Sequence, residues 1–469
     1  MADQSTQIDT NIAAKLAAFA ANLRSEDIPG AVTERAKYLI LDAVGIAHAS
    51  THYEFAHRSL SALTGLSEGA GRVPVIGLPN RLQLRDAMVM NGILIHGLDY
   101  DDTHVRGVIH STAACFPAAL GVGALAGLSG QDLLAAYVAG MEIATRLGAV
   151  AKGGFHQVGF HPTGLIGAFS TALIAGRLLG LSTQQLAMAQ GIALSTGSGS
   201  LEFLNDGAWT KRMHPGWAAG AGFTAASLAR HGFIGPKQVY EGRFGLYASH
   251  LGADADINLA LATDGLGQTW ETAQVAIKPI PTCHFTHACA DAAAILHREH
   301  GLKASDIKSV RALVPAEVVK TVCEPVTTKK RPQNSYDAQF SIPYIVATSL
   351  LRGNFGLQHL EGGAMADPEV LDLAQRIDYE VDPNSPFPKY YSGEVIVTLH
   401  DGRTLQHREQ INRGAADRPI PSTEIEQKFM DNMLLVTSRG RAEQVHGLIL
   451  GMDAGASAAD LAEGLAARG

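Results

Sequence analysis

Cysteine, aromatic residues and basic runs are scarce in this sequence. Its four cysteines form no C-x-x-C pair, which argues against a structural zinc or iron–sulfur cluster and against a disulfide framework. With 37 basic and 45 acidic residues and no basic run, nucleic-acid binding has no support. The apolar runs are interrupted before membrane-spanning length, and residues 1–10 show no basic and apolar leader. We therefore expect a cytoplasmic protein that binds neither nucleic acid nor membrane.

Small residues and helical periodicity dominate what is present. The chain has 50 glycines among 469 residues, and 46% of its residues are hydrophobic, which suits a large core of closely packed helices. Helical spacing prevails up to residue 272, whereas 273–412 mixes helices with a strand at 307–314 and a hairpin turning at Asp401-Gly402. We predict a mostly α protein. It has a large all-helical domain over 1–272, continued by 413–469, and a smaller α+β lid domain over 273–412.

Local patterns add several expectations. Ser129 and Ser182 begin capping boxes, and Glu142 with Arg146 has the spacing of an ion pair on an exposed helix face. Residues 217–231 are predicted as a helix and QVAIKPIP, residues 274–281, as a strand. We assign five further histidines to the surface: His48, His57, His250, His297 and His300.

The stretch HGLDYDDTHVRGVIHSTAACFP, residues 96–117, concentrates acidic and imidazole groups between two apolar segments. It holds three aspartates and three histidines: Asp99, Asp101, Asp102, His96, His104 and His110. A charged side chain that leaves water needs a partner or a shifted pKa, so the cluster is a candidate site for proton transfer. The alternative is a solvated loop whose aspartates cap the next helix.

Three later segments share this polar character at predicted helix ends. They contribute His156 and His161; Lys211, Arg212 and His214; and Lys278, Cys283, His284 and His287. Helix N-termini favour anions, so a cleft formed by these segments suits a small polycarboxylic acid. Proton abstraction beside a carboxylate, with histidine as acid and base, is the chemistry that this set favours.

Other kinds of site have weaker support. H-E-x-x-H is absent, and the spacing of His104 and His110 does not place both on one helix face, so a metal site is not favoured. A serine nucleophile lacks G-x-S-x-G. Cys283 beside His284 is only weak support for a cysteine nucleophile, because neighbours in sequence need not face each other.

Taken together, the polar stretches resemble the MmgE/PrpD family, which includes 2-methylcitrate dehydratase, cis-aconitate decarboxylase and iminodisuccinate epimerase. The matching stretches are HGLDYDDTH, GFHPTG, TKRMHPGWAA, IKPIPTCHFTHACAD and DAQFSIPY, in the family's order and over most of the chain. The resemblance implies an all-helical domain with an α+β lid, a homodimer, and a site between the domains that needs no cofactor and no metal.

The resemblance also implies roles for single residues. It predicts five catalytic residues: Asp99, His110, His161, Lys211 and Lys278. We expect the substrate to contact four others: His104, His214, Cys283 and His287. The decarboxylase branch has a histidine where this chain has Cys283, which weighs against cis-aconitate decarboxylation, and VIHSTAACFPAALG departs from the dehydratase branch, which weighs against methylcitrate.

The predicted activity is that of a lyase of the dehydratase type acting on a small di- or tricarboxylic hydroxy acid. Three alternatives stay open at this point. The same carbanion reprotonated on the other face gives an epimerase of a dicarboxylate, and loss of CO₂ gives a cis-aconitate-type decarboxylase. A carboxylate-binding protein without turnover is the third.

Overall fold

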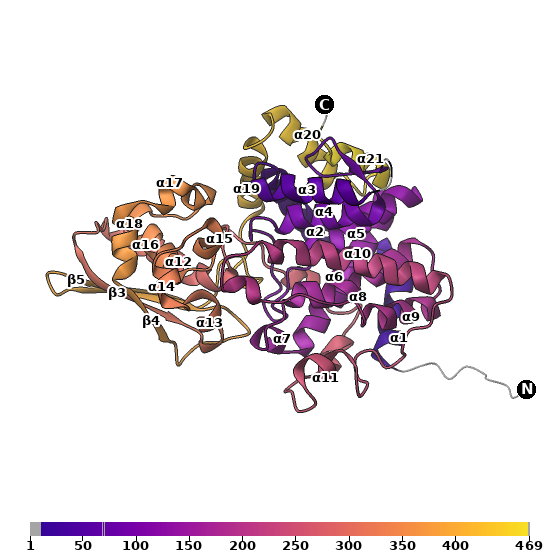
Figure 1. Cartoon of the computed structure of the whole chain (residues 1–469), viewed down its shortest axis with the longest axis horizontal. Coiled ribbons are helices and arrows are strands. Elements are labelled where there is room, and N and C mark those ends of the chain that lie inside the picture. Colours follow the sequence, from indigo (N-terminus) through magenta and orange to yellow (C-terminus); the bar gives the residue numbers. More distant parts are fainter. Residues whose placement is uncertain (1–10, 68, 70, 468–469) are drawn as a thin grey trace, which may run out of the picture.

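The computed structural model describes residues 11–67, 69 and 71–467. The segment where we found no leader, residues 1–10, lies outside the described residues. Helices dominate, and strands form one two-stranded and one four-stranded sheet within the described part. Figure 1 shows a helical body beside a smaller sheet-containing domain. The prediction of a mostly α protein with a small α+β part is confirmed.

The helical body is built on one large hydrophobic core. Its α-helices are α1 (Ile12–Asn22), α2 (Gly30–Ser50), α3 (Glu54–Leu66), α4 (Leu84–His96), α5 (Thr112–Ala126), α6 (Gly130–Val150), α7 (Gly154–Gln157), α8 (Pro162–Leu178), α9 (Thr183–Ala193), α10 (Thr210–Arg230) and α11 (Leu246–Leu251). Short 3-10 turns lie at Ser25–Asp27, Glu202–Leu204, Leu259–Ala262 and Glu271–Gln274, and β1 (Val73–Pro74) pairs antiparallel with β2 (Arg81–Leu82).

Glycines let α10 lie unusually close to α4 and α8. A Cβ added to Gly216 would lie 2.2 Å from the Val89 carbonyl oxygen, and one added to Gly222 would lie 2.1 Å from Thr171 Oγ1. Only a residue without a side chain allows such backbone approach. The close packing brings the start of α10 next to the end of α4, where the acidic segment begins.

The sheet-containing domain has its own core. Its sheet has the order β4-β3-β5-β6, in which β3 runs parallel to β4 and antiparallel to β5. The strands are β3 (Ile307–Val314), β4 (Ile377–Val381), β5 (Gly393–Leu399) and β6 (Thr404–Glu409). The helices are α12 (His287–His300), α13 (Val319–Val322), α14 (Val326–Lys330), α15 (Ser335–Gln339), α16 (Ile342–Arg352), α17 (Gly362–Met365) and α18 (Pro368–Gln375), with 3-10 turns at His284–Thr286, Ala316–Val318 and Leu357–Leu360.

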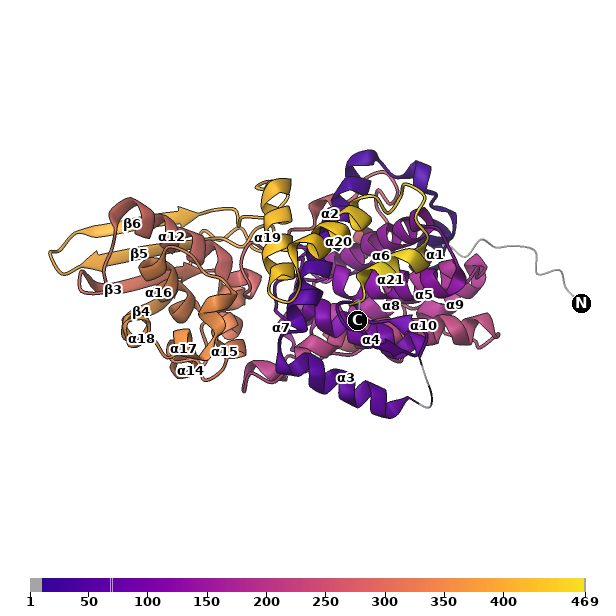
Figure 2. The same ribbon diagram turned by 90° about the horizontal axis from the view of Figure 1, so that it is seen from above.

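The last three helices lie against the helical body. They are α19 (Ser422–Leu434), α20 (Arg439–Leu450) and α21 (Ala458–Leu465). Ile425, Phe429 and Met433 of α19 belong to the core of the body, and a Cβ on Gly45 of α2 would lie 2.9 Å from the Phe429 ring. Figure 2 shows α19 on the side of the body that faces the sheet-containing domain. The domain boundaries at residues 272 and 412 stay a prediction.

Several local expectations are confirmed and others are wrong. Ser129 and Ser182 form the predicted capping boxes. The helix expected at 217–231 begins at Thr210, so the segment with Lys211 is its first turn rather than a loop. Residues 274–281 form no strand, because only Ala276 makes a single bridge, to Thr103. The prolines at 279 and 281 lack the N–H that a sheet needs.

Burial of charged side chains also differs from expectation. Glu142 and Arg146 lie 3.5 Å apart but inside the protein rather than on an exposed face. Glu142 also accepts hydrogen bonds from the backbone and hydroxyl of Thr272, both at 2.7 Å, which offsets its burial. His48 is buried instead of lying on the surface. The apolar helix α6 is long enough to cross a membrane, but the apolar window within it lies entirely inside the body.

Candidate active site

Asp99 lies just after α4 in a strained backbone conformation. Its φ is +49°, a value that residues other than glycine adopt rarely, and its side chain is buried. Such strain costs about 1–3 kcal/mol and concentrates at functional sites. The strained backbone therefore fixes the position of the Asp99 carboxylate at an energetic cost that packing of the core alone does not explain.

Two lysines from distant segments meet the Asp99 carboxylate. Oδ1 lies 2.6 Å from Lys278 Nζ and 3.0 Å from Lys211 Nζ, and Lys278 also donates to the Asp99 carbonyl. Burial opposes ionisation of Asp99, but the two ammonium groups outweigh it and hold its pKa well below the usual range. Oδ2 has no hydrogen-bond partner among the described residues. Because two ammonium groups meet one carboxylate, the ionised cluster carries one net positive charge.

The two neighbouring aspartates have different partners. Asp101 lies 2.8 Å from His96 Nδ1. Burial opposes its ionisation, but His96 lowers its pKa to about 2. Asp102 accepts a hydrogen bond from the Thr112 hydroxyl at 2.8 Å, and burial together with the charge of Asp101 raises its pKa to about 8. The three carboxyl groups of this segment thus differ in pKa, which is lowered for Asp99 and Asp101 and raised for Asp102.

His110 has a defined tautomer. Its Nδ1 lies 2.6 Å from the carbonyl oxygen of Asp102 and 3.2 Å from the Thr103 hydroxyl. A carbonyl oxygen only accepts, so Nδ1 carries the proton and Nε2 has a free lone pair. Burial and the positive charges of Lys278 and Lys211 hold the pKa of His110 well below its usual value. His110 is thus a neutral imidazole whose free Nε2 lone pair can accept a proton, as a general base requires.

His161 is the residue before α8, where Pro162 begins the helix. Its Nδ1 lies 3.0 Å from Nδ1 of His214, and its Nε2 is buried without a hydrogen-bond partner among the described residues. The His161 ring centroid is 5.9 Å from that of His110 and 5.5 Å from that of His96. Burial and neighbouring positive charge also hold the pKa of His161 well below its usual value.

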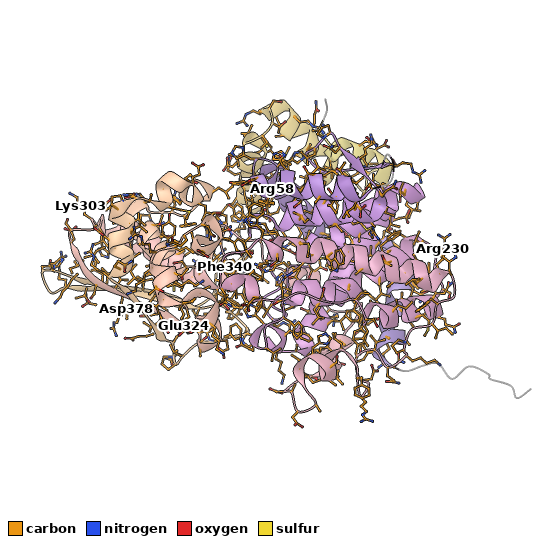
Figure 3. All side chains as sticks on the ribbon, viewed as in Figure 1. Arg58, Arg230, Lys303, Glu324, Phe340 and Asp378 are labelled. Atoms are coloured by element: carbon orange, nitrogen blue, oxygen red, sulfur yellow. The ribbon has the colours of Figure 1, made fainter. Side chains whose placement is uncertain are left out.

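A small cavity lies where the helical body meets the sheet-containing domain. Its open space is about 30 Å³, enough for roughly two water molecules at about 10–15 Å³ each. Figure 3 shows Phe340, one of its wall residues, at this junction. The other residues that line it are Thr103, Val108, His110, His156, His161, Leu201, Phe203, Leu204, Lys211, Cys283, His284, Phe285, Thr321 and Tyr391. A polycarboxylate needs more room, so binding requires the two walls to separate.

Seven of the nine predicted residues gather at this cavity or directly behind it. Four line it: His110, His161, Lys211 and Cys283. Asp99 contacts the wall residue Lys211, and Lys278 contacts Asp99. Burial and the charge of Asp99 raise the pKa of the Cys283 thiol to about 11, so the thiol is neutral at ordinary pH.

His214 is the seventh and lies behind His161. The remaining two predicted residues, His104 and His287, do not line the cavity. The isolated bridge between His104 and Ile109 directs His104 away, and its Nε2 lies 2.9 Å from Glu271. His287 is fully buried against His284, with ring centroids 4.5 Å apart. The structure thus places His104 and His287 in the framework around the site.

Several wall residues were not anticipated from the sequence. Phe203 and Tyr391 lie outside the stretches quoted for the resemblance. Thr103 and Phe340 lie within HGLDYDDTH and DAQFSIPY but were given no role. His96 lies in the same acidic segment as its partner Asp101, and this proximity in sequence could have marked it as a site residue. In the described part of the chain, no group of three or more His, Cys, Asp or Glu side chains is arranged to hold a metal ion.

Comparison with known proteins covers nearly the whole chain. Residues 14–258 match the MmgE/PrpD N-terminal domain, and residues 280–451 match the MmgE/PrpD C-terminal domain. Cis-aconitate decarboxylase of Aspergillus terreus is 26% identical over 465 residues, covering 95% of this chain and 94% of that protein. Cis-aconitate decarboxylase of Homo sapiens is 28% identical over 437 residues, covering 90% and 88%.

Proposed function

The chain belongs to the MmgE/PrpD family, and from that premise we propose that it is a dehydratase of a small di- or tricarboxylic hydroxy acid. The protein uses its own side chains as acid, base and cations, and acts as a cytoplasmic homodimer. The observation that carries the proposal is the pair of neutral imidazoles, His110 and His161, on the wall of one cavity beside Lys211. Two proton-transfer groups and a cation at one carboxylate are what an elimination needs.

His110 is the base in this reaction. Its Nε2 lone pair takes the proton from the carbon next to a substrate carboxylate, and the C–H electron pair forms the new double bond. The C–OH bond breaks, and a proton from His161 Nε2 joins the departing oxygen to give water. Atoms balance, because the substrate loses one proton to His110 and its departing hydroxide takes one proton from His161. His161 is reprotonated at Nδ1 in the same event, so that no imidazolate is left.

The lysine pair stabilises the charge that develops as the proton leaves. Negative charge spreads from the carbon into the adjacent carboxylate, and the cluster of Lys211, Lys278 and Asp99 has one positive charge to offer it. The lysines lose little mobility on binding, because Asp99 already holds both in place. Such preorganised cations act most strongly where water is excluded.

The test is incubation of the purified protein in D₂O with 2-methylcitrate, citrate, cis-aconitate, tartrates and iminodisuccinate, followed by NMR. Formation of an alkene with loss of water is the expected result. Deuterium exchange at the α-carbon without net loss points to an epimerase instead. Binding of a carboxylate by calorimetry without any exchange or turnover would contradict an enzymatic role.

Decarboxylation is a second candidate, favoured by the relatives described above, which are named as cis-aconitate decarboxylases. The aromatic wall of Phe203, Phe285 and Phe340 also suits loss of neutral CO₂ from a desolvated carboxylate. The decarboxylase branch of the family has histidine at the position of Cys283. Cys283→His should therefore raise the ratio of CO₂ release to water release. An unchanged ratio in a folded variant removes Cys283 as the discriminating residue.

A further inference from the structure

The hydrogen bond between His161 and His214 joins two Nδ1 atoms 3.0 Å apart. A neutral imidazole carries its proton on one nitrogen only. One Nδ1 must therefore donate and the other accept, so the tautomer of His214 decides the tautomer of His161. His161 has a bare Nε2 if it donates to His214, and a protonated Nε2 if it accepts from it.

The proposed dehydration requires one of these two states. His110 already supplies the base, since its Nδ1–H is committed to the Asp102 carbonyl. The second group must then deliver a proton from His161 Nε2, which is buried and has no other partner among the described residues. This places a proton on His214 Nδ1, which donates to His161 Nδ1.

We propose that His214 is a proton relay that connects His161 to solvent. His161 gives its Nε2 proton to the departing oxygen and takes the Nδ1 proton of His214 in the same event. His214 receives a proton from water at Nε2. After the product leaves, the proton on His110 Nε2 passes through cavity water to His161 Nε2, the Nδ1 proton of His161 returns to His214 Nδ1, and His214 releases its Nε2 proton to solvent, which restores both tautomers. Both imidazoles are neutral before and after, so no imidazolate forms. The inference rests on the proposed function, which it deepens by assigning the source of the acid proton.

The position of His214 suits this role better than substrate contact. It keeps 7% of its surface exposed, and no described residue bonds to its Nε2. It lies beneath the loop at 198–200, where Gly199 has φ +137° and a Cβ would lie 3.3 Å from His214 Nδ1. The Gly199 carbonyl in turn accepts the His161 N–H at 2.8 Å. The loop therefore covers the pair closely while Ser198 and Ser200 lie exposed above it.

The electrostatic surroundings keep the pair neutral. The groups that act on it are His96 from α4, Lys211 from α10 and His110 from the acidic segment, and all of them oppose protonation. Burial with His96 and Lys211 lowers the pKa of His214 to about 4. An acid that works as a stored imidazolium is therefore disfavoured at neutral pH, whereas a relay between neutral tautomers needs no stored charge.

Nitrogen-15 NMR of the histidine side chains tests the tautomers without any substrate. At pH 7.5, proton-coupled spectra should show His161 protonated at Nε2 and His214 protonated at Nδ1, with single His→Gln variants used for assignment. The reverse pattern, His161 protonated at Nδ1, overturns the relay. Because no turnover is involved, this result stands even if every substrate in the panel fails, which would count against the proposed function alone.

Kinetics separate a relay from a residue that only positions His161. In His214→Asn, the amide nitrogen replaces Nδ1 as donor to His161 but has no second nitrogen to reload it. We expect an unchanged His161 tautomer, a similar KM and a kcat about 10²-fold lower, the low end of acid–base catalysis. Added imidazole should restore turnover in His214→Ala. His231→Gln, an exposed position at the end of the same helix, is the matched control.

A wild-type kcat in His214→Asn overturns the proposal, because the hydrogen bond alone is then sufficient. The solvent deuterium isotope effect gives a second measure. A relay moves more than one proton in the limiting step, so a plot of kcat against the deuterium fraction of the solvent should curve in the wild type. It should become linear in His214→Asn. A linear wild-type plot together with an unaffected variant contradicts the relay independently of the NMR result.

Discussion

Lys428 Nζ of α19 lies 2.7 Å from Asp42 Oδ1 of α2, and both side chains are buried. The same ammonium group donates to the carbonyl oxygens of Tyr100 and Lys278, each at 2.8 Å. Tyr100 follows Asp99 in the chain, and Lys278 is the lysine that holds the Asp99 carboxylate. One side chain from the last part of the sequence thus fixes the two segments that form the charged centre of the site.

Removal of the Lys428 charge should destabilise the whole protein. Lys428→Met leaves Asp42 buried without its partner, and loss of one member of a buried pair costs roughly 3–5 kcal/mol. Unfolding in urea, followed by circular dichroism, measures the change. The double variant Lys428→Met with Asp42→Asn should recover part of the loss, because the uncompensated charge is gone. A single variant as stable as the wild type would contradict the structural role of this pair.

Activity should depend on the charge of Asp99 more than on its backbone conformation. Asn tolerates positive φ nearly as well as Asp, so Asp99→Asn keeps the conformation and removes only the anion. With no carboxylate between them, Lys211 and Lys278 repel each other, and we expect kcat to fall about 10²-fold or more. Asp99→Gly, which relieves the strain, is the comparison. The Gly variant also lacks the carboxylate, so equal losses of kcat in the Gly and Asn variants would show that charge decides and that backbone strain is irrelevant. An active Gly variant would contradict the requirement for the charge.

Stability should fall as the pH falls below neutral, and His48 provides a clean test. Burial and the charge of Arg441 lower the pKa of His48 to about 4, against about 6.5 in the unfolded chain. Between these values the unfolded state binds more protons, so stability is lost as the pH drops through the window. The loss is about 1.4 kcal/mol per pH unit.

His48→Gln should remove this contribution while keeping a side chain that forms hydrogen bonds. Urea midpoints between pH 4 and 7 should therefore depend less steeply on pH in the variant than in the wild type. His57→Gln, at an exposed position of α3, should leave the dependence unchanged. Equal slopes for all three proteins would mean that folding does not lower the pKa of His48.

The predicted homodimer has a candidate surface on α10. Trp209, Met213 and Trp217 follow one another at four-residue spacing and are 44%, 41% and 53% exposed. Exposed aromatic residues in a row are typical of an interface, and a buried interface tryptophan contributes about 2 kcal/mol or more. Trp217→Glu should therefore raise the dimer dissociation constant about 30-fold or more in sedimentation experiments.

The control for that experiment is Val381→Glu on β4, where Val381 is 51% exposed. It should leave the dimer intact, since β4 belongs to the sheet-containing domain and α10 to the helical body. A wild-type protein that is monomeric at all concentrations refutes the homodimer itself. A dimer unaffected by Trp217→Glu moves the interface to another face.

Local patterns were sufficient to predict the helices and the polar segments of the site. Capping residues such as Ser129 and Ser182 act within one turn, so their effect is visible in the sequence. The direction of a side chain is less local. His104 and His110 lie in the same segment, but the bridge between His104 and Ile109 directs one to Glu271 and leaves the other in the cavity wall. A single hydrogen-bonded turn of this kind produces no periodic pattern in the sequence.

Contacts between distant segments could not be predicted from one sequence. Glu142 was expected at the surface because its pairing with Arg146 is local, whereas its stronger partner is Thr272, which is 130 positions away. The same holds for Asp42 with Lys428. Phe203 and Tyr391 were assigned no role from the sequence, and only the packing of the two domains makes them part of the wall of a cavity. The missing information in each case is tertiary.

The position of α19 has a consequence for how an active molecule is made. A ribosome releases the chain from its first residue onward, so the aspartates, histidines and lysines of the site all emerge before residue 428. Until α19 follows, Asp42 has no Lys428, and the carbonyls of Tyr100 and Lys278 have no shared donor. An interrupted translation product holds every reactive group and lacks the piece that aligns them. The active site is therefore completed only when α19 has emerged, after all of its reactive groups.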